Sequence, residues 1–129
     1  MAWVQLVTLL ALVEYFAFAS AVGSARVRYG VKAPATTGNE NFERYFRVQQ
    51  NTLELLVVFL PLLWMAAGYW NPLWVAAVGA VFVLGRLVYF RGYVREPRAR
   101  HLGFTLSIVP VVALALGAAV GIVRALSGW

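Results

Sequence analysis

Residues 53–90 read LELLVVFLPLLWMAAGYWNPLWVAAVGAVFVLGRLVYF, two apolar runs that are separated by a short turn at Gly68–Pro72. Each run, Leu53–Trp70 and Leu73–Phe90, is close to the roughly 20 residues with which a helix crosses about 30 Å of hydrocarbon. Asn71 suits a helix N-cap, and the proline after it suits the first helical position. The stretch therefore predicts a helical hairpin that crosses a membrane.

Two further apolar runs flank the hairpin, from Ala2 to about Ala25 and from Leu102 to Val123. Because lipid offers the backbone no hydrogen-bond partner, a spanning segment is a helix or part of a closed barrel, and the alternation typical of barrel strands is missing. Hydrophobic residues make up 62% of the 129 residues and charged residues 12%, which excludes a water-soluble domain. We expect an all-α integral membrane four-helix bundle that forms a single domain over residues 1–129.

The net charge of +6 arises mainly from basic residues that lie around the first and third connections between the apolar runs. Ten of the eleven basic residues lie there: Arg26, Arg28, Lys32, Arg44, Arg47, Arg86, Arg91, Arg95, Arg98 and Arg100. Two such connections share one side of a four-span protein, and the positive-inside tendency places that side in the cytoplasm and both termini outside. The basic charge is therefore assigned to topology, and no nucleic-acid partner is predicted.

The first span has no preceding basic residue, so we expect it to be retained and not cleaved as a signal peptide. Two short exterior segments and the lack of an organelle retention signal favour a bacterial inner membrane, with the endoplasmic reticulum as the alternative. Both locations leave the basic side in the cytoplasm.

The sequence lacks the residues that several kinds of catalysis require. The sequence has no cysteine and one histidine, so it offers no cysteine nucleophile and no metal site. It has no Ser-His-Asp set of credible spacing, no phosphate-binding glycine loop and no Walker motif, which removes hydrolases and nucleotide-dependent enzymes. The single histidine, His101, is expected to be a solvated side chain at the membrane interface. Any thiol chemistry must use a thiol from outside the chain.

The second span contains polar residues, although a charge within a span costs about 2.5–3.5 kcal/mol. Arg47, Asn51 and Glu54 are spaced by four and three residues and share one helical face, whereas Gln49 points almost the opposite way. This pattern predicts two separate polar contacts for the helix. A pairing of Arg47 with Glu54, within or between subunits, is an alternative of equal weight.

Further polar residues are expected at the cytoplasmic ends of the spans. On the third span, Arg86, Tyr89 and Tyr93 share one face, although interfacial tyrosines alone are more often membrane anchors. Five residues from the cytoplasmic ends of the four helices could together line one basic pocket: Arg26, Arg47, Tyr89, Tyr93 and Arg100. Arginine holds carboxylates with paired hydrogen bonds, and Glu54 could take an ammonium group. This set predicts a site for a peptide with two carboxylates and one amine.

Two stretches resemble a known family: FERYFRVQQNTLE at residues 42–54 and VLGRLVYFRGY at residues 83–93. With SARVRYGVKAPATTG at residues 24–38, they resemble the MAPEG superfamily of small four-helix membrane proteins. Its members include microsomal glutathione transferases, leukotriene-C synthase and the lipoxygenase-activating protein. RVQQNTLE is most similar to the R-x-x-QNTLE pattern of the microsomal glutathione transferase branch. The resemblance implies a homotrimer that binds glutathione between neighbouring subunits at the cytoplasmic side.

The resemblance also implies roles for individual residues. Arg100 matches the arginine assigned to the glutathione sulfur, where a guanidinium would stabilise the thiolate and lower a thiol pKa that is normally about 8.5. The glutathione contacts of the family match, on one subunit, Arg47, Asn51, Glu54, Tyr89 and Tyr93, and, from the adjoining subunit, Arg26 and Gln49.

Three positions depart from the pattern of leukotriene-C synthase. Val27 stands where that enzyme has a second arginine, Leu55 stands where it has a tyrosine, and the proline of the second helix comes later, at Pro61. Arg28 would replace the missing arginine only if the helix end turned differently. These departures weaken a leukotriene-forming interpretation and leave the implied thiolate apparatus intact.

The resemblance therefore predicts a membrane-bound glutathione transferase. It would conjugate glutathione to lipophilic electrophiles and reduce lipid hydroperoxides, both of which would arrive from the membrane lipid. A non-catalytic lipid-binding or scaffold protein of the lipoxygenase-activating type is one alternative. A binder without glutathione would have no need of the retained residues Arg47, Asn51, Glu54, Tyr93 and Arg100. A small multidrug exporter with an embedded carboxylate at Glu14 is another, and it leaves the arginine-rich helix ends unexplained.

Overall fold

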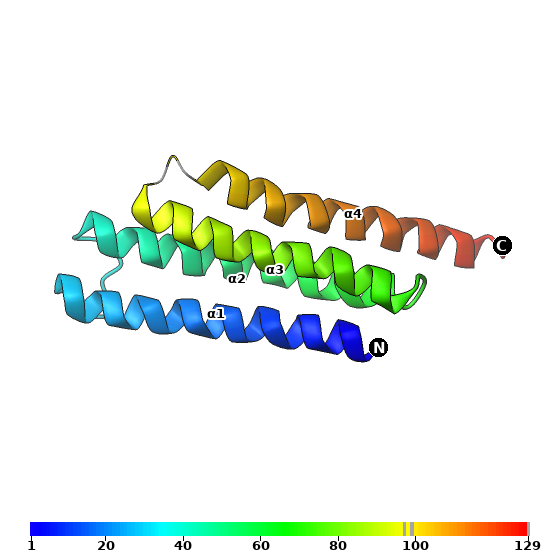
Figure 1. Cartoon of the computed structure of the whole chain (residues 1–129), viewed down its shortest axis with the longest axis horizontal. Helices are drawn as coiled ribbons and strands as arrows, with labels where there is room; N and C mark the ends of the chain where they lie inside the picture. Colours follow the sequence, from blue (N-terminus) through cyan, green and yellow to red (C-terminus); the bar gives the residue numbers. More distant parts are fainter. Residues whose placement is uncertain (97, 99, 129) are drawn as a thin grey trace.

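The computed structural model describes residues 1–96, 98 and 100–128. Within these residues it contains the helices α1 (Ala2–Tyr29), α2 (Glu40–Ala67), α3 (Pro72–Arg95) and α4 (Arg100–Leu126). All four are long and apolar enough to cross a membrane. Figure 1 shows them side by side along one long axis, with α4 reaching beyond the other helices at its C-terminal end. The predicted all-α, multi-pass membrane bundle is confirmed.

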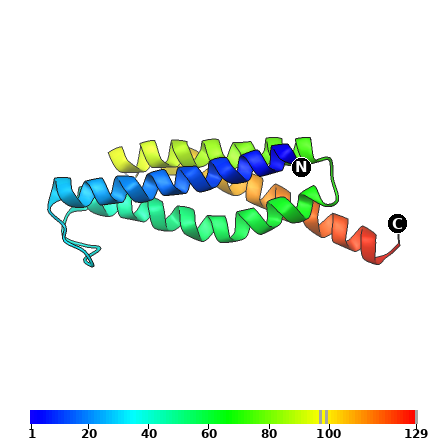
Figure 2. The same ribbon diagram turned by 90° about the horizontal axis from the view of Figure 1, so that it is seen from below.

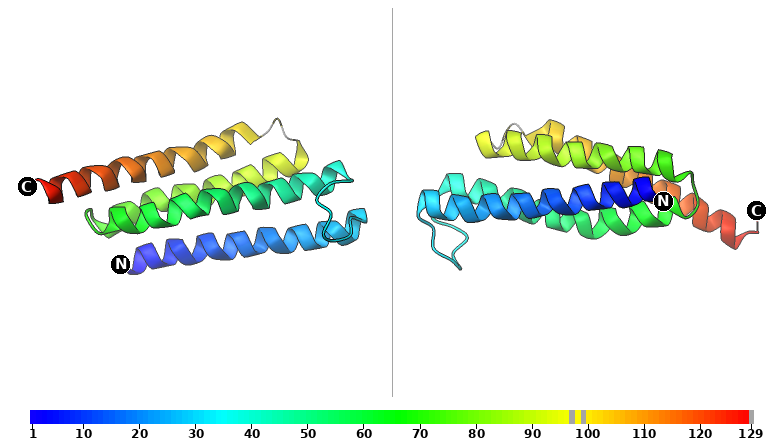
Figure 3. Two further views of the ribbon diagram at one scale, coloured as in Figure 1. Left: turned by 180° about the vertical axis from the view of Figure 1, so that it is seen from behind. Right: turned by 60° about the horizontal axis from the view of Figure 1, so that its bottom comes forward.

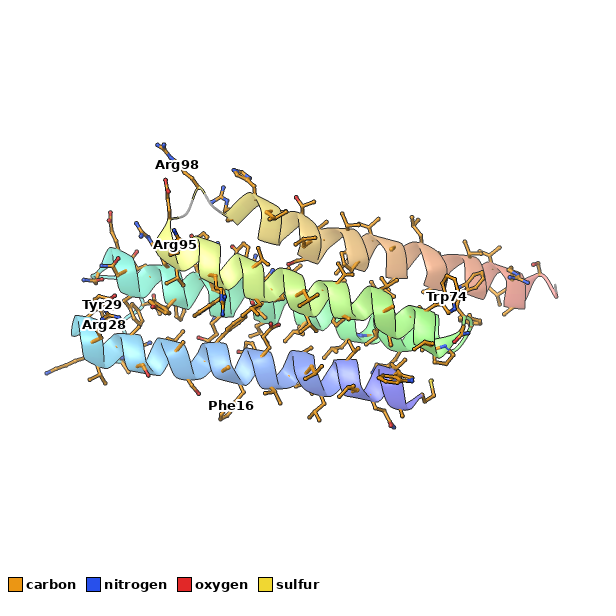
Figure 4. All side chains as sticks on the ribbon, viewed as in Figure 1. Phe16, Arg28, Tyr29, Trp74, Arg95 and Arg98 are labelled. Carbon is orange, nitrogen blue, oxygen red and sulfur yellow. The ribbon has the colours of Figure 1, made fainter. Side chains whose placement is uncertain are left out.

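Successive helices run in opposite directions, so the connections alternate between the two ends of the bundle. The α1–α2 and α3–α4 connections lie together at one end, and the α2–α3 turn and both termini lie at the other (Figures 2 and 3). We call these the basic end and the terminal end. Figure 4 places Arg28, Arg95 and Arg98 at the basic end and Trp74 at the terminal end. The basic residues of two distant sequence regions are thereby gathered on one side.

Local signals define where the helices begin and end. The Asn39 side chain accepts hydrogen bonds from the backbone N–H groups of Asn41, at 2.9 Å, and Phe42, at 3.1 Å. Asn71 caps α3 in the same way, with Pro72 in the first turn, as the sequence predicts. Gly30, at φ 70°, ends α1 in the left-handed conformation that glycine adopts without strain.

The centre of the bundle is filled by aromatic and branched side chains. Phe59 of α2 and Phe82 of α3 are fully buried, and their rings stack with centroids 3.9 Å apart. Gly79 lies beside this pair, where a Cβ atom would stand 2.8 Å from Leu63 Cδ1. Phe16, in contrast, is 73% exposed and points away from the other helices (Figure 4). Apolar side chains on the outside suit a bundle whose surroundings are lipid.

Two glycines allow α3 and α4 to approach closely. A Cβ atom at Gly85 would stand 2.7 Å from the backbone carbon of Leu106, and one at Gly103 would overlap the backbone N and Cα of Tyr89. Small residues at a helix crossing permit such backbone contact in membranes. Because Gly103 lies one turn beyond Arg100, this crossing also brings the start of α4 against Tyr89.

Candidate functional site

A cavity of about 470 Å³ lies at the basic end, between α2, α3 and α4. Its lining residues are Arg47, Asn51, Tyr89, Tyr93, Arg100, His101 and Phe104. The structure thus brings together five of the residues that the sequence predicts for the site, from three helices. A second cavity of about 290 Å³ adjoins the first and shares Arg47 and Tyr93 with it.

The two tyrosines form one wall of the cavity. Tyr89 is only 5% exposed, and its ring stacks on that of Tyr93, with centroids 5.4 Å apart and planes inclined by 15°. On α3 the two residues are four positions apart, which places them on the same face of the helix. The wall therefore combines flat apolar rings with two phenolic hydroxyl groups.

Beneath this wall lies Arg86, which is fully buried. Its Nε donates to Thr52 Oγ1 at 3.2 Å, one terminal nitrogen donates to Ser107 Oγ at 3.2 Å, and the other donates to Asn51 Oδ1 at 2.8 Å. Its guanidinium carbon is 4.3 Å from the centroid of the Tyr89 ring. Arg86 therefore ties α2, α3 and α4 together directly below the cavity.

A contact from a side chain to the backbone holds α2 and α3 beside each other at the basic end. One terminal nitrogen of Arg44 donates to the backbone oxygen of Arg95 at 3.1 Å, which satisfies a carbonyl in the last turn of α3. Arg47 lies one turn further along α2. The same contact therefore places Arg47 next to the end of α3 and at the cavity.

The electrostatics of the cavity favour an anion. Arg47 and Arg100 are exposed at its lining, and both lie within electrostatic range of the Tyr89 hydroxyl. Among the described residues that line it, none is acidic. No three metal-ligating side chains gather in the part of the chain that the structure describes. Arginine forks suit carboxylates, and a guanidinium also stabilises a thiolate.

Three sequence-predicted residues lie outside this cavity. A terminal nitrogen of Arg26 donates to the backbone oxygen of Ala35 at 2.7 Å, and Gln49 Nε2 donates to the Tyr15 hydroxyl at 3.4 Å. Glu54 is exposed on α2. Within one chain, therefore, the structure does not bring Arg26, Gln49 or Glu54 to the residues that line the cavity.

Sequence reasoning missed several neighbours of the site. Thr52 and Ser107 are both buried partners of Arg86, yet each is a small polar residue within an apolar run. Phe104 lines the cavity and follows Arg100 by four positions, one helical turn, so helical spacing could have found it. His101 is exposed, as expected of a solvated side chain, but it also lines the cavity.

Comparison with known proteins identifies the family. Residues 4–120 match the model of the MAPEG family. The uncharacterized protein sll1147 of Synechocystis sp. is 48% identical over 120 residues, which cover 93% of this chain and 88% of that protein. Human microsomal glutathione S-transferase 2 is 41% identical over 116 residues, 90% of this chain and 79% of that protein. Bovine leukotriene C4 synthase is 39% identical over 94 residues, 73% of this chain and 63% of that protein. Since the family model extends through all four helices, this chain belongs to the MAPEG family, as its two sequence motifs predict.

Proposed function

We propose that residues 1–129 act as one domain and that the protein is a membrane-bound glutathione transferase. The observation that carries the proposal is the cavity at the basic end, where Arg47 and Arg100 face a stacked tyrosine wall. The likeness to human microsomal glutathione S-transferase 2, at 41% identity over most of both chains, supports the same activity. Glutathione, with its two carboxylates, one ammonium group and one thiol, matches a cavity whose charges are positive.

We assign different contacts with glutathione to different residues. Arg47 pairs with a carboxylate, and Asn51, Tyr89 and Tyr93 supply neutral hydrogen-bond donors around it. Glu54 does not line the cavity within its own chain, and we propose that it takes the ammonium group from the exposed face of α2, one helical turn beyond Asn51. None of these interactions involves a metal ion.

We further propose that three copies of the chain form a ring. Arg26 and Gln49 lie on the side of the bundle where α1 and α2 meet, away from the cavity. In a closed ring, each subunit presents one surface to a different surface of its neighbour. That arrangement would bring Arg26 and Gln49 of one subunit to the cavity of the next, which accounts for polar residues on two faces of α2.

Arg100 supplies the chemical activation. Its guanidinium beside the glutathione sulfur stabilises the thiolate, so the thiol proton is released to solvent near neutral pH. The thiolate then attacks an electrophilic carbon, the C–S bond forms, and the leaving group departs with the electron pair of the bond that breaks. Phe104, which lines the cavity and is 43% exposed, provides an apolar side through which a lipophilic electrophile arrives from the bilayer.

The same thiolate can reduce a lipid hydroperoxide. It attacks one peroxide oxygen, the O–O bond breaks, and the lipid leaves as an alcohol after it takes up a proton. The glutathione sulfenic acid that forms then reacts with a second glutathione to give the disulfide and water. Both activities use the same bound thiolate, and the second substrate enters from the same membrane side.

Glu14 requires no transport role. It is half-buried on α1 and lies within electrostatic range of the buried Arg86. Buried charges in membrane helices are ordinarily balanced by one another. We therefore propose that Glu14 acts within the bundle beside Arg86 and not in transport.

The test is an ultraviolet titration of the purified protein with glutathione at neutral pH. We expect a saturable thiolate band, followed by turnover of an activated aryl chloride. S-methylglutathione, which has no ionisable thiol, serves as the control and should bind without producing the band. Absence of a band with glutathione itself would contradict the proposal and favour a non-catalytic lipid-binding protein.

A further inference from the structure

We propose that Arg86 is a positioning residue that orients the side-chain amide of Asn51, so that its N–H donors face the cavity. This inference rests on the proposed function, because the ligand that receives those donors is a carboxylate of glutathione. Arg86 itself is fully buried below the cavity and is not among the residues that line it. It acts on the ligand only through its neighbour.

The polarity of one hydrogen bond determines the orientation. A guanidinium group can only donate, so the 2.8 Å contact from Arg86 to Asn51 requires the amide oxygen as the acceptor. The amide nitrogen and its two hydrogens are then directed elsewhere. Because Asn51 lines the cavity, these donors are available to a ligand there. The opposite orientation would present the amide oxygen, which repels a carboxylate.

The remaining contacts of Arg86 fix the plane from which it donates. Thr52 and Ser107 each accept from a different nitrogen, at 3.2 Å, and the Tyr89 ring covers one face of the guanidinium. Ser107 Oγ in turn donates to the backbone oxygen of Gly103 at 2.7 Å, so its hydrogen is engaged and its lone pairs accept. Because Thr52, Ser107 and the Tyr89 ring hold the planar guanidinium in place, it donates to Asn51 from one direction. The Asn51 amide then has a single favourable orientation.

The first test is Asn51→Asp, with glutathione affinity measured by calorimetry and stability measured by thermal unfolding. The carboxylate still accepts from Arg86, so we expect an unfolding temperature at or above that of the wild type. The cavity side, however, exchanges N–H donors for a charged oxygen, and we expect glutathione to bind about tenfold more weakly or worse. Arg91→Ala is the control. Arg91 is exposed on α3, does not line the cavity and is not a hydrogen-bond partner of Arg86, so its replacement should change Kd by less than about twofold.

A double-mutant cycle separates positioning from a purely structural role. Arg86→Lys keeps the charge but cannot donate to three acceptors in one plane. If Arg86 acts through Asn51, the double variant Arg86→Lys, Asn51→Ala binds glutathione about as weakly as the weaker single variant. Additive losses would overturn the proposal, as would wild-type affinity in Asn51→Asp. Wild-type protein that binds no glutathione would overturn the proposed function as well, and this result is distinguishable because it appears before any substitution is made.

Discussion

Burial separates the arginines at the basic end into two kinds. Arg86 is fully buried, and three neutral acceptors and an aromatic ring occupy its guanidinium. Arg47 and Arg100 are exposed at the cavity lining. A guanidinium whose N–H groups already donate to protein acceptors has few donors left for a ligand, whereas an exposed guanidinium can still donate two parallel hydrogen bonds to a carboxylate. Ligand binding is therefore assigned to Arg47 and Arg100, and Arg86 is assigned to the architecture beneath them.

Replacement of Arg100 by alanine should separate binding from activation. A neighbouring positive charge lowers the pKa of a thiol, so its removal raises that pKa, by about one to three units. At neutral pH the thiolate population should fall about tenfold or more, and the rate of conjugation should regain its plateau only at higher pH. Glutathione should still bind, because the other lining residues remain. The thiolate band and the pH profile of conjugation measure both effects.

Arg91→Ala provides a matched control for this variant. Arg91 is exposed on α3 near the same end of the bundle and does not line the cavity. Its loss removes one positive charge without removing a ligand contact, so the pH profile should stay within a few tenths of a unit of the wild type. An Arg100→Ala protein with the same profile as Arg91→Ala would show that Arg100 does not activate the thiol.

At the residue scale, helical spacing could predict those lining residues that share a face. Arg47 with Asn51 and Tyr89 with Tyr93 are each four positions apart, so each pair is visible in the sequence. The acceptors of Arg86 are not visible in this way, because Thr52 and Ser107 meet it only through the packing of α2 and α4 against α3. Such contacts depend on helix rotation and depth, for which a run of apolar letters carries no signal.

At the scale of the helices, the α3–α4 crossing at Gly103 sets the position of Arg100. A methyl group at Gly103 would overlap the Tyr89 backbone, which cannot move as a side-chain tip can. Gly103→Ala should therefore displace the start of α4 and destabilise the bundle by about 1–3 kcal/mol. The displacement should also weaken the thiolate band, because Arg100 lies one turn away. Thermal unfolding and the glutathione titration together measure these consequences.

Gly117→Ala, in the same helix, is the control for the crossing. A Cβ atom at Gly117 would lie 3.5 Å from Trp70 Nε1, an ordinary contact. Since alanine is favoured over glycine in a helix by about 1 kcal/mol, this variant should be as stable as the wild type or slightly more stable. Equal losses at both glycines would mean that close approach at Gly103 does not position α4.

The number of helices and their order follow from the apolar runs, but the ends of the helices do not. Helix α1 continues to Tyr29 where the apolar run ends near Ala25, and α3 continues to Arg95 where the run ends at Phe90. These extra turns lie where polar residues are no longer costly, so hydropathy cannot mark them. A capping side chain does mark a helix start. The Asn39 side chain accepts from the backbone N–H groups two and three residues later, which have no partner within the helix.

At the scale of the whole molecule, the cavity and the basic connections share one end of the bundle, and both termini share the other (Figure 2). The positive-inside tendency then predicts that the cavity faces the cytoplasm. Because the sequence has no cysteine, single-cysteine variants report this orientation without background. In intact bacterial spheroplasts, a membrane-impermeant maleimide should label Ser127→Cys and spare Thr37→Cys, and lysis should expose both. Labelling of Thr37→Cys in intact cells would reverse the assignment.

If neighbouring subunits of a ring share each site, two inactive variants should complement each other in mixed assemblies. If Arg26 of one subunit completes the cavity that contains Arg47 of the next, Arg26→Ala and Arg47→Ala should each impair every site in a homogeneous assembly. In mixed assemblies, an Arg47→Ala subunit still offers its native Arg26 to an Arg26→Ala neighbour, whose Arg47 is native. Random mixing in equal amounts restores roughly a quarter of the sites, because the two subunits must meet in one order around the ring.

Co-expression of the two variants should therefore recover glutathione-dependent turnover that neither variant shows alone. Proteins expressed separately and mixed after purification in detergent serve as the control, since assembled rings that do not exchange subunits cannot form the native site. Turnover that stays at the level of the single variants after co-expression would place Arg26 and Arg47 in the same subunit's site or in no common site. Recovery would show that the catalytic unit is the contact between two copies of the chain, which explains why Arg26 and Gln49 lie away from the cavity within one chain.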